Sequence, residues 1–381
     1  MNILNNTLEF SLELAIITFT IAMLVSYLCY PVIIKVSNLK NLMSEPNQRD
    51  VHATKTPNLG GIGIFFAIYL TVAILGNYYE SDKLLNILGA MTIMFFIGLV
   101  DDLIGVSPKS KLIGQVIVAI IIIFMTNLRI SSLYGILGIY ELPYIVSVIL
   151  TVLFYITIIN AYNLIDGVDG LAGSFAITAN VLFAIFFYLN SNFTMLFLSL
   201  GIIGALTSFL FFNFSKTKKI FMGDTGSMVI GMLLAYQAVN LTSVDFYETL
   251  AFIDLKSLVY ILALFSFPLI DTIRVFSIRI KEGKSPFTAD NNHIHHNLLA
   301  AGLKHWEISI TTSLYTLSIV FVMFLCNELE IHKMLFVLSL VWFFTAIVAD
   351  NLSLTVIDLE LKFKQKVLRD INFKKSLLYA N

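Results

Sequence analysis

Charged residues are scarce in this sequence. Asp, Glu, Lys and Arg together make up 13% of the 381 residues, whereas hydrophobic residues make up 58%, and the mean hydropathy is +0.86. Soluble globular domains carry about 25% charged residues. The composition therefore excludes a soluble protein and indicates a protein embedded in a membrane.

Cysteine is nearly absent as well. Cys29 and Cys326 both lie inside apolar runs, which excludes a disulfide framework and a metal site built on paired cysteines. The sequence also lacks internal repeats and low-complexity linkers. It therefore predicts one membrane domain over residues 1–351 and a basic cytoplasmic tail over 352–381, with no nucleic-acid partner. The first apolar run is too long for a signal-peptide core and lacks a basic start, which predicts a retained helix.

Long apolar runs fill almost the whole chain. A helix of about 20 apolar residues crosses a hydrocarbon core of about 30 Å. About eleven such runs are present, so we predict an all-α, polytopic membrane bundle of about eleven helices. The predicted spans are 12–34, 59–78, 84–100, 111–128, 143–162, 171–189, 193–213, 225–242, 255–276, 308–326 and 334–350.

Lysine and arginine predict the orientation of these spans. With the N-terminus outside and the C-terminus inside, 20 of the 24 lysines and arginines fall in cytoplasmic loops or in the C-terminal tail. Only Lys83, Arg129, Lys256 and Lys333 fall elsewhere. Positive residues collect in cytoplasmic loops of membrane proteins, so this distribution predicts that topology. The basic face would suit anionic lipid headgroups or an anionic substrate.

Clusters of polar residues fall at the cytoplasmic ends of the predicted spans. Asp101 and Asp102 end the third span, "NAYNLIDGVDG" ends the fifth, Asp224 begins the eighth and Asp271 ends the ninth; "HIHH" (residues 293–296) follows in a loop. The topology came from Lys and Arg alone, yet all of these clusters share one face. We expect them to form an active site at the membrane surface.

Simpler explanations apply to each cluster. Asp271 could only cap a helix, and the glycines could only break helices or allow close packing. The neighbouring carboxylates of Asp101 and Asp102 repel each other unless a cation or hydrogen-bond donors stabilise them, which favours a functional role. "HIHH" could bind phosphate or a metal, and zinc is the less favoured alternative because no cysteine ligand is near.

The oxygen-rich composition of these clusters indicates a hard cation. Mg²⁺ typically takes one or two protein oxygens and completes its shell with water and substrate phosphates. Asn and Asp side chains at helix ends, surrounded by Lys, Arg and His, could together hold a magnesium diphosphate. The sequence therefore predicts phosphoryl-transfer chemistry, with Mn²⁺ as an alternative ion.

Several motifs together resemble a known family. "DD" followed by "KSKLIGQ", then "NAYNLIDGVDGLAG", "FMGDTGSMVIG" and "SPFTADNNHIHHNLL", resemble motifs of the polyprenyl-phosphate N-acetylhexosamine-1-phosphate transferases. The earlier "PNQRDVHATKTPNLGGIGIF" resembles the first cytoplasmic loop of that family. The motifs run in the family's order from about residue 46 to 303. The "HIHH" form is most similar to the bacterial undecaprenyl-phosphate GlcNAc-1-phosphate transferases.

This resemblance implies an activity at the bacterial cytoplasmic membrane. A UDP-sugar, most simply UDP-GlcNAc, would react with undecaprenyl phosphate and Mg²⁺ on the cytoplasmic face to give undecaprenyl-diphospho-sugar and UMP, the first lipid-linked step of cell-surface polysaccharide synthesis. By motif position, Asn163 and Asp224 would bind the metal, and four aspartates would be catalytic. The catalytic group would be Asp101, Asp102, Asp166 and Asp169; the substrate-binding group would be Lys111, Asn163, Arg279, His293, His295 and His296.

The sequence departs from the family pattern in two places. Asn58 precedes "LGG" where a basic residue is common, and Asn291 stands where Arg or Lys is frequent. The donor sugar therefore stays open among the UDP-N-acetylhexosamines. A secondary transporter is the alternative from another class, although transporters usually place their acids near the bilayer midplane. A scaffold would not need these clusters, and monomer and homodimer both stay open.

Overall fold

The structure is a computed structural model that describes residues 2–43, 56–76, 82–242, 256–285 and 292–351. It confirms an all-α membrane bundle, with one small hairpin as the exception. The helices are α1 (Asn2–Lys40), α2 (Gly60–Leu75), α3 (Asp82–Ile104), α4 (Pro108–Thr126), α5 (Tyr144–Leu164), α6 (Leu171–Leu189), α7 (Phe193–Asn213), α8 (Gly223–Thr242), α9 (Ser257–Leu264), α10 (Ser266–Lys281), α11 (Ile294–Ala300), α12 (His305–Leu325) and a last helix, Ile331–Asn351. The predicted tail, 352–381, lies outside the described residues, as does most of the first loop.

Each of the predicted spans corresponds to a helix or a helix pair. In the described part of the chain, eight helices are long and apolar enough to cross a membrane, and the pair α9 and α10 raises this number to nine. Helix α2 has only 16 residues. Helix α8 has the length but not the apolarity. The number of crossings and the orientation therefore stay predictions.

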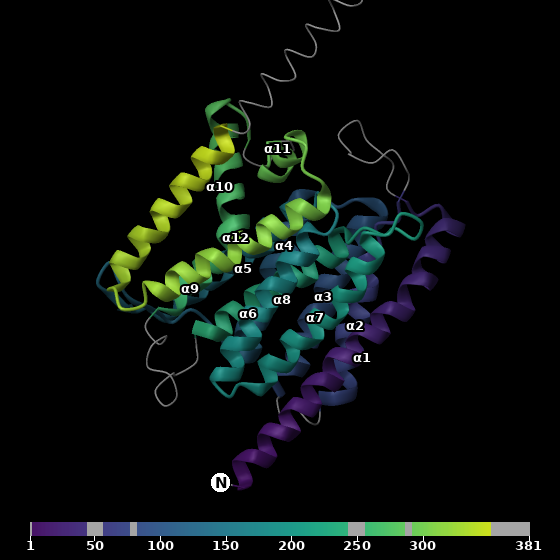
Figure 1. Ribbon diagram of the computed structural model, residues 1–381, viewed down its shortest axis with the longest axis horizontal. Coiled ribbons are helices and arrows are strands. Elements are labelled where there is room, and N and C mark those ends of the chain that lie inside the picture. Colours follow the sequence, from purple (N-terminus) through teal and green to yellow (C-terminus); the bar gives the residue numbers. More distant parts are fainter. Residues whose placement is uncertain (1, 44–55, 77–81, 243–255, 286–291, 352–381) are drawn as a thin grey trace, which may run out of the picture.

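Helix α8 lies at the centre of the bundle. Every residue from Thr225 to Thr242 is buried, and α3, α5 and α2 pack around it (Figure 1). Because α8 faces protein and not lipid on all sides, it can carry polar residues such as Gln237, which donates to Ser199 Oγ of α7 at 2.7 Å. The low apolarity of α8 follows from this position.

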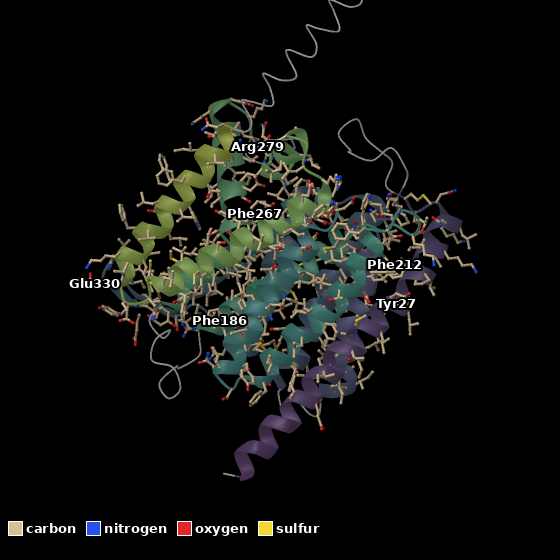
Figure 2. All side chains as sticks on the ribbon, viewed as in Figure 1. Tyr27, Phe186, Phe212, Phe267, Arg279 and Glu330 are labelled. Atoms are coloured by element: carbon tan, nitrogen blue, oxygen red, sulfur yellow. The ribbon has the colours of Figure 1, made fainter. Side chains whose placement is uncertain are left out.

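Apolar residues on the outer helices divide between lipid and core. Helix α1 runs along one edge of the bundle (Figure 1) and packs against α7 and α2. Tyr27 of α1 lies beside Phe212 of α7 (Figure 2), with ring centroids 5.4 Å apart. The last helix is largely exposed, and its apolar residues include Phe336, Phe343 and Phe344. These faces are what a lipid-embedded bundle requires.

The predicted span over 255–276 corresponds to two helices, α9 and α10, and not to one straight helix. The chain bends by 68° between α9 and α10. Pro268 lies in the first turn of α10. It has no N–H to donate to the carbonyl of Leu264, and its ring crowds that carbonyl, which favours a bend at this point. The same break brings the second half of the segment, α10, against α5 and α12.

The sequence also failed to indicate a β-hairpin. Strands β1 (Ser132–Ile136) and β2 (Ile139–Glu141) pair antiparallel between α4 and α5. Leu137 and Gly138 form the turn with positive φ angles of 54° and 75°, as in the two-residue turns typical of hairpins. The hairpin lies at the end of the bundle opposite the aspartate clusters, where Leu137 N–H donates to His332 Nε2 at 3.2 Å.

Candidate active site

The start of α8 is fixed by Asp102 from the last turn of α3. Asp102 Oδ1 accepts from Asp224 N–H at 2.9 Å, and Oδ2 accepts from Thr225 N–H at 2.9 Å and from Thr225 Oγ1 at 2.5 Å. A carboxylate at a helix N-terminus satisfies free backbone N–H groups and interacts favourably with the helix dipole. Asp102 therefore holds Asp224 in place, and its predicted catalytic role stays a prediction.

The segment before α2 also holds the start of α8 in place. Phe221 N–H donates to Pro57 O at 2.8 Å, and Gly61 N–H donates to Met222 O at 2.8 Å. Gly223 follows with φ at +70°, and a Cβ there would lie 2.0 Å from Asn58 O. Only glycine fits this position. The described part of the first-loop motif is thus the partner of "FMGD".

Lys111 joins two of the predicted catalytic and metal-binding aspartates. Its Nζ forms a salt bridge with Asp101 Oδ2 and lies 3.1 Å from Asp224 Oδ2. Asp101 Oδ1 accepts from Val106 N–H at 2.7 Å, which closes the turn between α3 and α4. The Lys111 cation thus stabilises the carboxylate of Asp101, and hydrogen-bond donors stabilise that of Asp102. Two neighbouring carboxylates need such partners because they repel each other.

Asn163, at the end of α5, contacts the same aspartate. Its Nδ2 donates to Asp224 Oδ1 at 2.5 Å and to Ser227 Oγ at 2.7 Å. The structure thus brings together both predicted metal ligands. Asn160, one turn earlier, forms a reciprocal amide pair with Gln115 of α4, at 2.7 and 3.4 Å, which braces the two helices.

Asp166 lies in the loop between α5 and α6, near Asp224. Burial raises its pKa well above the usual range, and the charges of Asp224, Asp102 and Asp169 raise this pKa further. A carboxyl group in this position experiences an excess of negative charge. Such a site would gain most from a bound cation.

Asp169, three residues later in this loop, lies beside a lysine and a histidine. Its Oδ2 lies 2.6 Å from Lys219 Nζ and 3.0 Å from His305 Nδ1. The following Gly170 has φ at +77°, and its N–H donates to Asn213 Oδ1 at 2.6 Å. The structure places Asp166 and Asp169 in one loop, and their catalytic roles stay predictions.

The "HIHH" segment forms the start of α11 and packs against the same loop. Asp271 lies inside α10, so it does not cap the end of its own helix; it accepts from Ile294 N–H of α11 at 2.7 Å and lies 2.7 Å from His293 Nδ1. His295 is buried, and a Cβ on Gly167 would lie 2.7 Å from His295 Nε2. Burial is the main cause that lowers the pKa of His295 to about 3; the charge of Asp271 raises this pKa, and His296 and His293 lower it, by smaller amounts. The ring is therefore neutral near pH 7.

The other predicted substrate-binding residues lie nearby. His296 is half-buried, with its ring centroid 4.4 Å from that of His295. Arg279 is buried in the last turn of α10 (Figure 2), with its guanidinium 5.9 Å from the Phe276 ring centroid of the same helix. Among the described residues, no group of three or more His, Cys, Asp or Glu could hold a metal ion, which gives the zinc alternative no support. Asn291 lies outside the described residues.

Two residues of this site were not predicted from the sequence. Lys219 stands in a basic loop directly before "FMGD", and that position was a signal for it. His305 opens α12 and belongs to none of the motifs, so only the fold reveals it. The aspartate and histidine clusters share one end of the bundle, as predicted; which side of the membrane this end faces stays a prediction.

Comparison with known proteins shows the family of this sequence. The sequence model of glycosyl transferase family 4 matches residues 84–242, from α3 to α8. The decaprenyl-phosphate N-acetylglucosaminephosphotransferase of Mycobacterium leprae (strain TN) is 30% identical over 325 residues, which cover 80% of this chain and 81% of that protein. The protein of the same name from Mycobacterium tuberculosis (strain ATCC 25618 / H37Rv) is 31% identical over 325 residues, 80% of each chain.

A third relative comes from another bacterial group. The undecaprenyl-phosphate alpha-N-acetylglucosaminyl 1-phosphate transferase of Escherichia coli (strain K12) is 28% identical over 274 residues, covering 70% of this chain and 72% of that protein. The matched family region contains Asp101, Asp102, Asn163 and Asp224, the residues that meet at the start of α8. The chain therefore belongs to glycosyl transferase family 4, among the polyprenyl-phosphate N-acetylhexosamine-1-phosphate transferases that its motifs predicted.

Proposed function

We propose that this protein transfers N-acetylglucosamine 1-phosphate from UDP-GlcNAc to a polyprenyl phosphate such as undecaprenyl phosphate. The names of the relatives given above support N-acetylglucosamine as the sugar and a polyprenyl phosphate as the lipid acceptor. The main support is that Asp101, Asp224, Asn163 and Lys111 contact one another at one end of an apolar helix bundle. A lipid phosphate at a membrane surface would lie at such an end, and the Lys and Arg distribution supports the cytoplasmic face of the bacterial inner membrane.

The reaction needs little activation of its nucleophile. An oxygen of the lipid phosphate, anionic near neutral pH, attacks the β-phosphorus of the nucleotide sugar and forms a new P–O bond. The bond between this phosphorus and the oxygen bridging to the α-phosphate breaks, and UMP leaves with that oxygen. The main obstacle is the repulsion between two anions, which positive charge at the site would reduce. A phospho-enzyme trapped with UDP-sugar alone would contradict this direct displacement.

The residues at the start of α8 fit a magnesium ion. Asp224 and Asn163 would be its protein ligands, which suits the preference of Mg²⁺ for one or two protein oxygens with water and substrate phosphates completing the shell. Burial is the main cause of the raised pKa of Asp166, and the nearby carboxylates of Asp224, Asp102 and Asp169 raise it further, which supports a place for a cation here. When bound, the ion would neutralise diphosphate charge. Lys111, which contacts Asp101 and Asp224, would be positioned to bind a phosphate oxygen.

The proposal is tested by one reconstituted reaction. Purified protein in detergent is mixed with undecaprenyl phosphate, Mg²⁺ and UDP-GlcNAc, and both UMP and the lipid product are measured. We expect UMP formation that requires acceptor and Mg²⁺ together. A panel containing UDP-GalNAc and other UDP-N-acetylhexosamines then identifies the donor. If no donor releases UMP, the proposed reaction is wrong, and uptake into proteoliposomes would test the transporter alternative.

A further inference from the structure

Helix α12 contacts Asp169 through two side chains. Asp169 N–H donates to His305 Nδ1 at 3.1 Å, and this nitrogen also lies 3.0 Å from Asp169 Oδ2. Ser309 Oγ has one hydrogen to donate and lies 3.2 Å from Asp169 O and 3.1 Å from His305 O of its own helix. The backbone N–H, the backbone carbonyl and the carboxylate of one loop residue are therefore all contacted from one helix.

The spacing of these two residues explains the arrangement. His305 and Ser309 are four residues apart, so they lie on the same face of α12. Ser309 is buried, and its neighbour Ile308 is fully buried. The first turn of α12 is thus anchored by apolar packing while its polar groups point at the loop.

Other contacts fix the rest of this loop. Lys219, from the loop before α8, forms the 2.6 Å salt bridge with Asp169 Oδ2. His295 of α11 packs against Gly167, and Asn213 of α7 accepts from Gly170 N–H. The short loop between α5 and α6 is therefore held on both sides of Asp166 by α11 and α12, two helices that follow each other in the chain.

We propose that His305 and Ser309 are positioning residues for the nucleotide-sugar donor. They hold Asp169, and with it the loop carrying Asp166, in the conformation that binds the donor. This inference rests on the proposed function and on the family resemblance, which implies that Asp166 and Asp169 lie against the nucleotide of the donor and not against the lipid acceptor. His305 acts through Asp169 and is not itself a catalytic residue.

The experiment measures donor and acceptor separately. His305→Ala removes the contacts to Asp169. We expect the KM for the UDP-sugar and the Kd for UMP both to rise about tenfold, because about one hydrogen bond that holds the loop is lost. The KM for undecaprenyl phosphate is expected to stay within about twofold. His305→Asn places an amide oxygen near the former position of Nδ1 and is expected to restore much of the donor affinity. Ser309→Ala is expected to give a smaller change of the same kind, about threefold.

His332→Ala is the matched control. His332 also accepts from a backbone N–H, that of Leu137, but at the opposite end of the bundle. This variant is expected to keep both KM values. Should His305→Ala prevent folding, Ser309→Ala and His305→Asn carry the test. Unchanged donor KM and UMP affinity in a folded His305 or Ser309 variant would overturn the inference, as would an equal rise in donor and acceptor KM; an inactive wild-type protein would instead overturn the proposed function.

Discussion

The two ends of the bundle are held together by different chemistry. At the end opposite the site, amides, hydroxyls and single cations connect the helices without a cluster of carboxylates: Asn192 Nδ2 donates to Asn240 Oδ1 at 3.1 Å, Tyr260 OH donates to Asn327 Oδ1 at 2.9 Å, and Lys256 Nζ donates to Asn327 O. At the site end, carboxylates from α3, α8 and the loop after α5 lie close together, with Lys111 and Lys219 beside them. Bringing like charges together opposes folding. Hydrogen bonds alone could have joined the helices, so the charge cluster is best explained by function.

The largest expected effect at the site end is that of Asp224→Ala. This change removes a predicted magnesium ligand and the partner of Lys111 and Asn163. We expect kcat to fall at least about 10³-fold, the scale of losing a central electrostatic contribution, while the protein stays inserted and folded. Mg²⁺-dependent UMP release and size-exclusion profiles measure both quantities. Glu141→Ala in the exposed β2 strand is the control at the other end; near-normal activity of Asp224→Ala would remove this residue from the site.

Asp102→Asn tests whether Asp102 holds the start of α8. Asparagine keeps one acceptor oxygen but places an NH₂ group against backbone or hydroxyl donors. We expect the free energy of unfolding to fall by about 2 kcal/mol, because hydrogen bonds to a charged group are lost. Thermal unfolding in detergent measures this change. If Asp102→Asn were as stable as the wild type yet inactive, a direct catalytic role would be favoured over the capping role.

Two glycines of α3 differ in how closely other residues pack against them. A Cβ on Gly98 would lie 2.6 Å from Thr225 Cα at the start of α8, whereas a Cβ on Gly89 would meet nothing within 4 Å. Gly98→Ala should destabilise the protein by about 1–3 kcal/mol and reduce turnover. Gly89→Ala should be neutral or stabilising by up to about 1 kcal/mol. Equal thermal stability of the two variants would contradict the close contact of α3 with α8.

The last expected effect concerns pH. The pKa of His295 is about 3 in the folded protein, below the value of about 6.5 expected for an unfolded chain. The unfolded state therefore binds a proton first as the pH falls, and His295 reduces stability progressively between about pH 6.5 and 3, by at most about 1.4 kcal/mol per pH unit. Thermal unfolding of the wild type and His295→Asn at pH 7.5, 6.0 and 5.0 tests this. The two should converge as the pH falls, and a constant difference would contradict a buried neutral ring; His332→Asn is the control.

Prediction from the sequence succeeded where the signal was local. The apolar runs gave the helices, and the polar motifs at their ends gave the aspartates, Asn163 and the histidines that meet at one end. The prediction did not include the 68° bend between α9 and α10, because Pro268 stands inside an apolar run and leaves the apolar pattern unchanged. The sequence analysis also missed the β-hairpin. Its turn depends on the left-handed backbone conformation of Leu137 and Gly138, which a search for apolar runs does not detect.

The sequence by itself determined the membrane class, the family and which residue types gather at the helix ends, because composition, run length and motif order are properties of the chain alone. Only the tertiary structure decided what each side chain contacts. Asp102 lies against the start of α8, Lys111 between two aspartates and His305 against Asp169. These contacts join residues more than 100 positions apart in the sequence. Such pairings depend on how helices pack around α8, which no local pattern specifies.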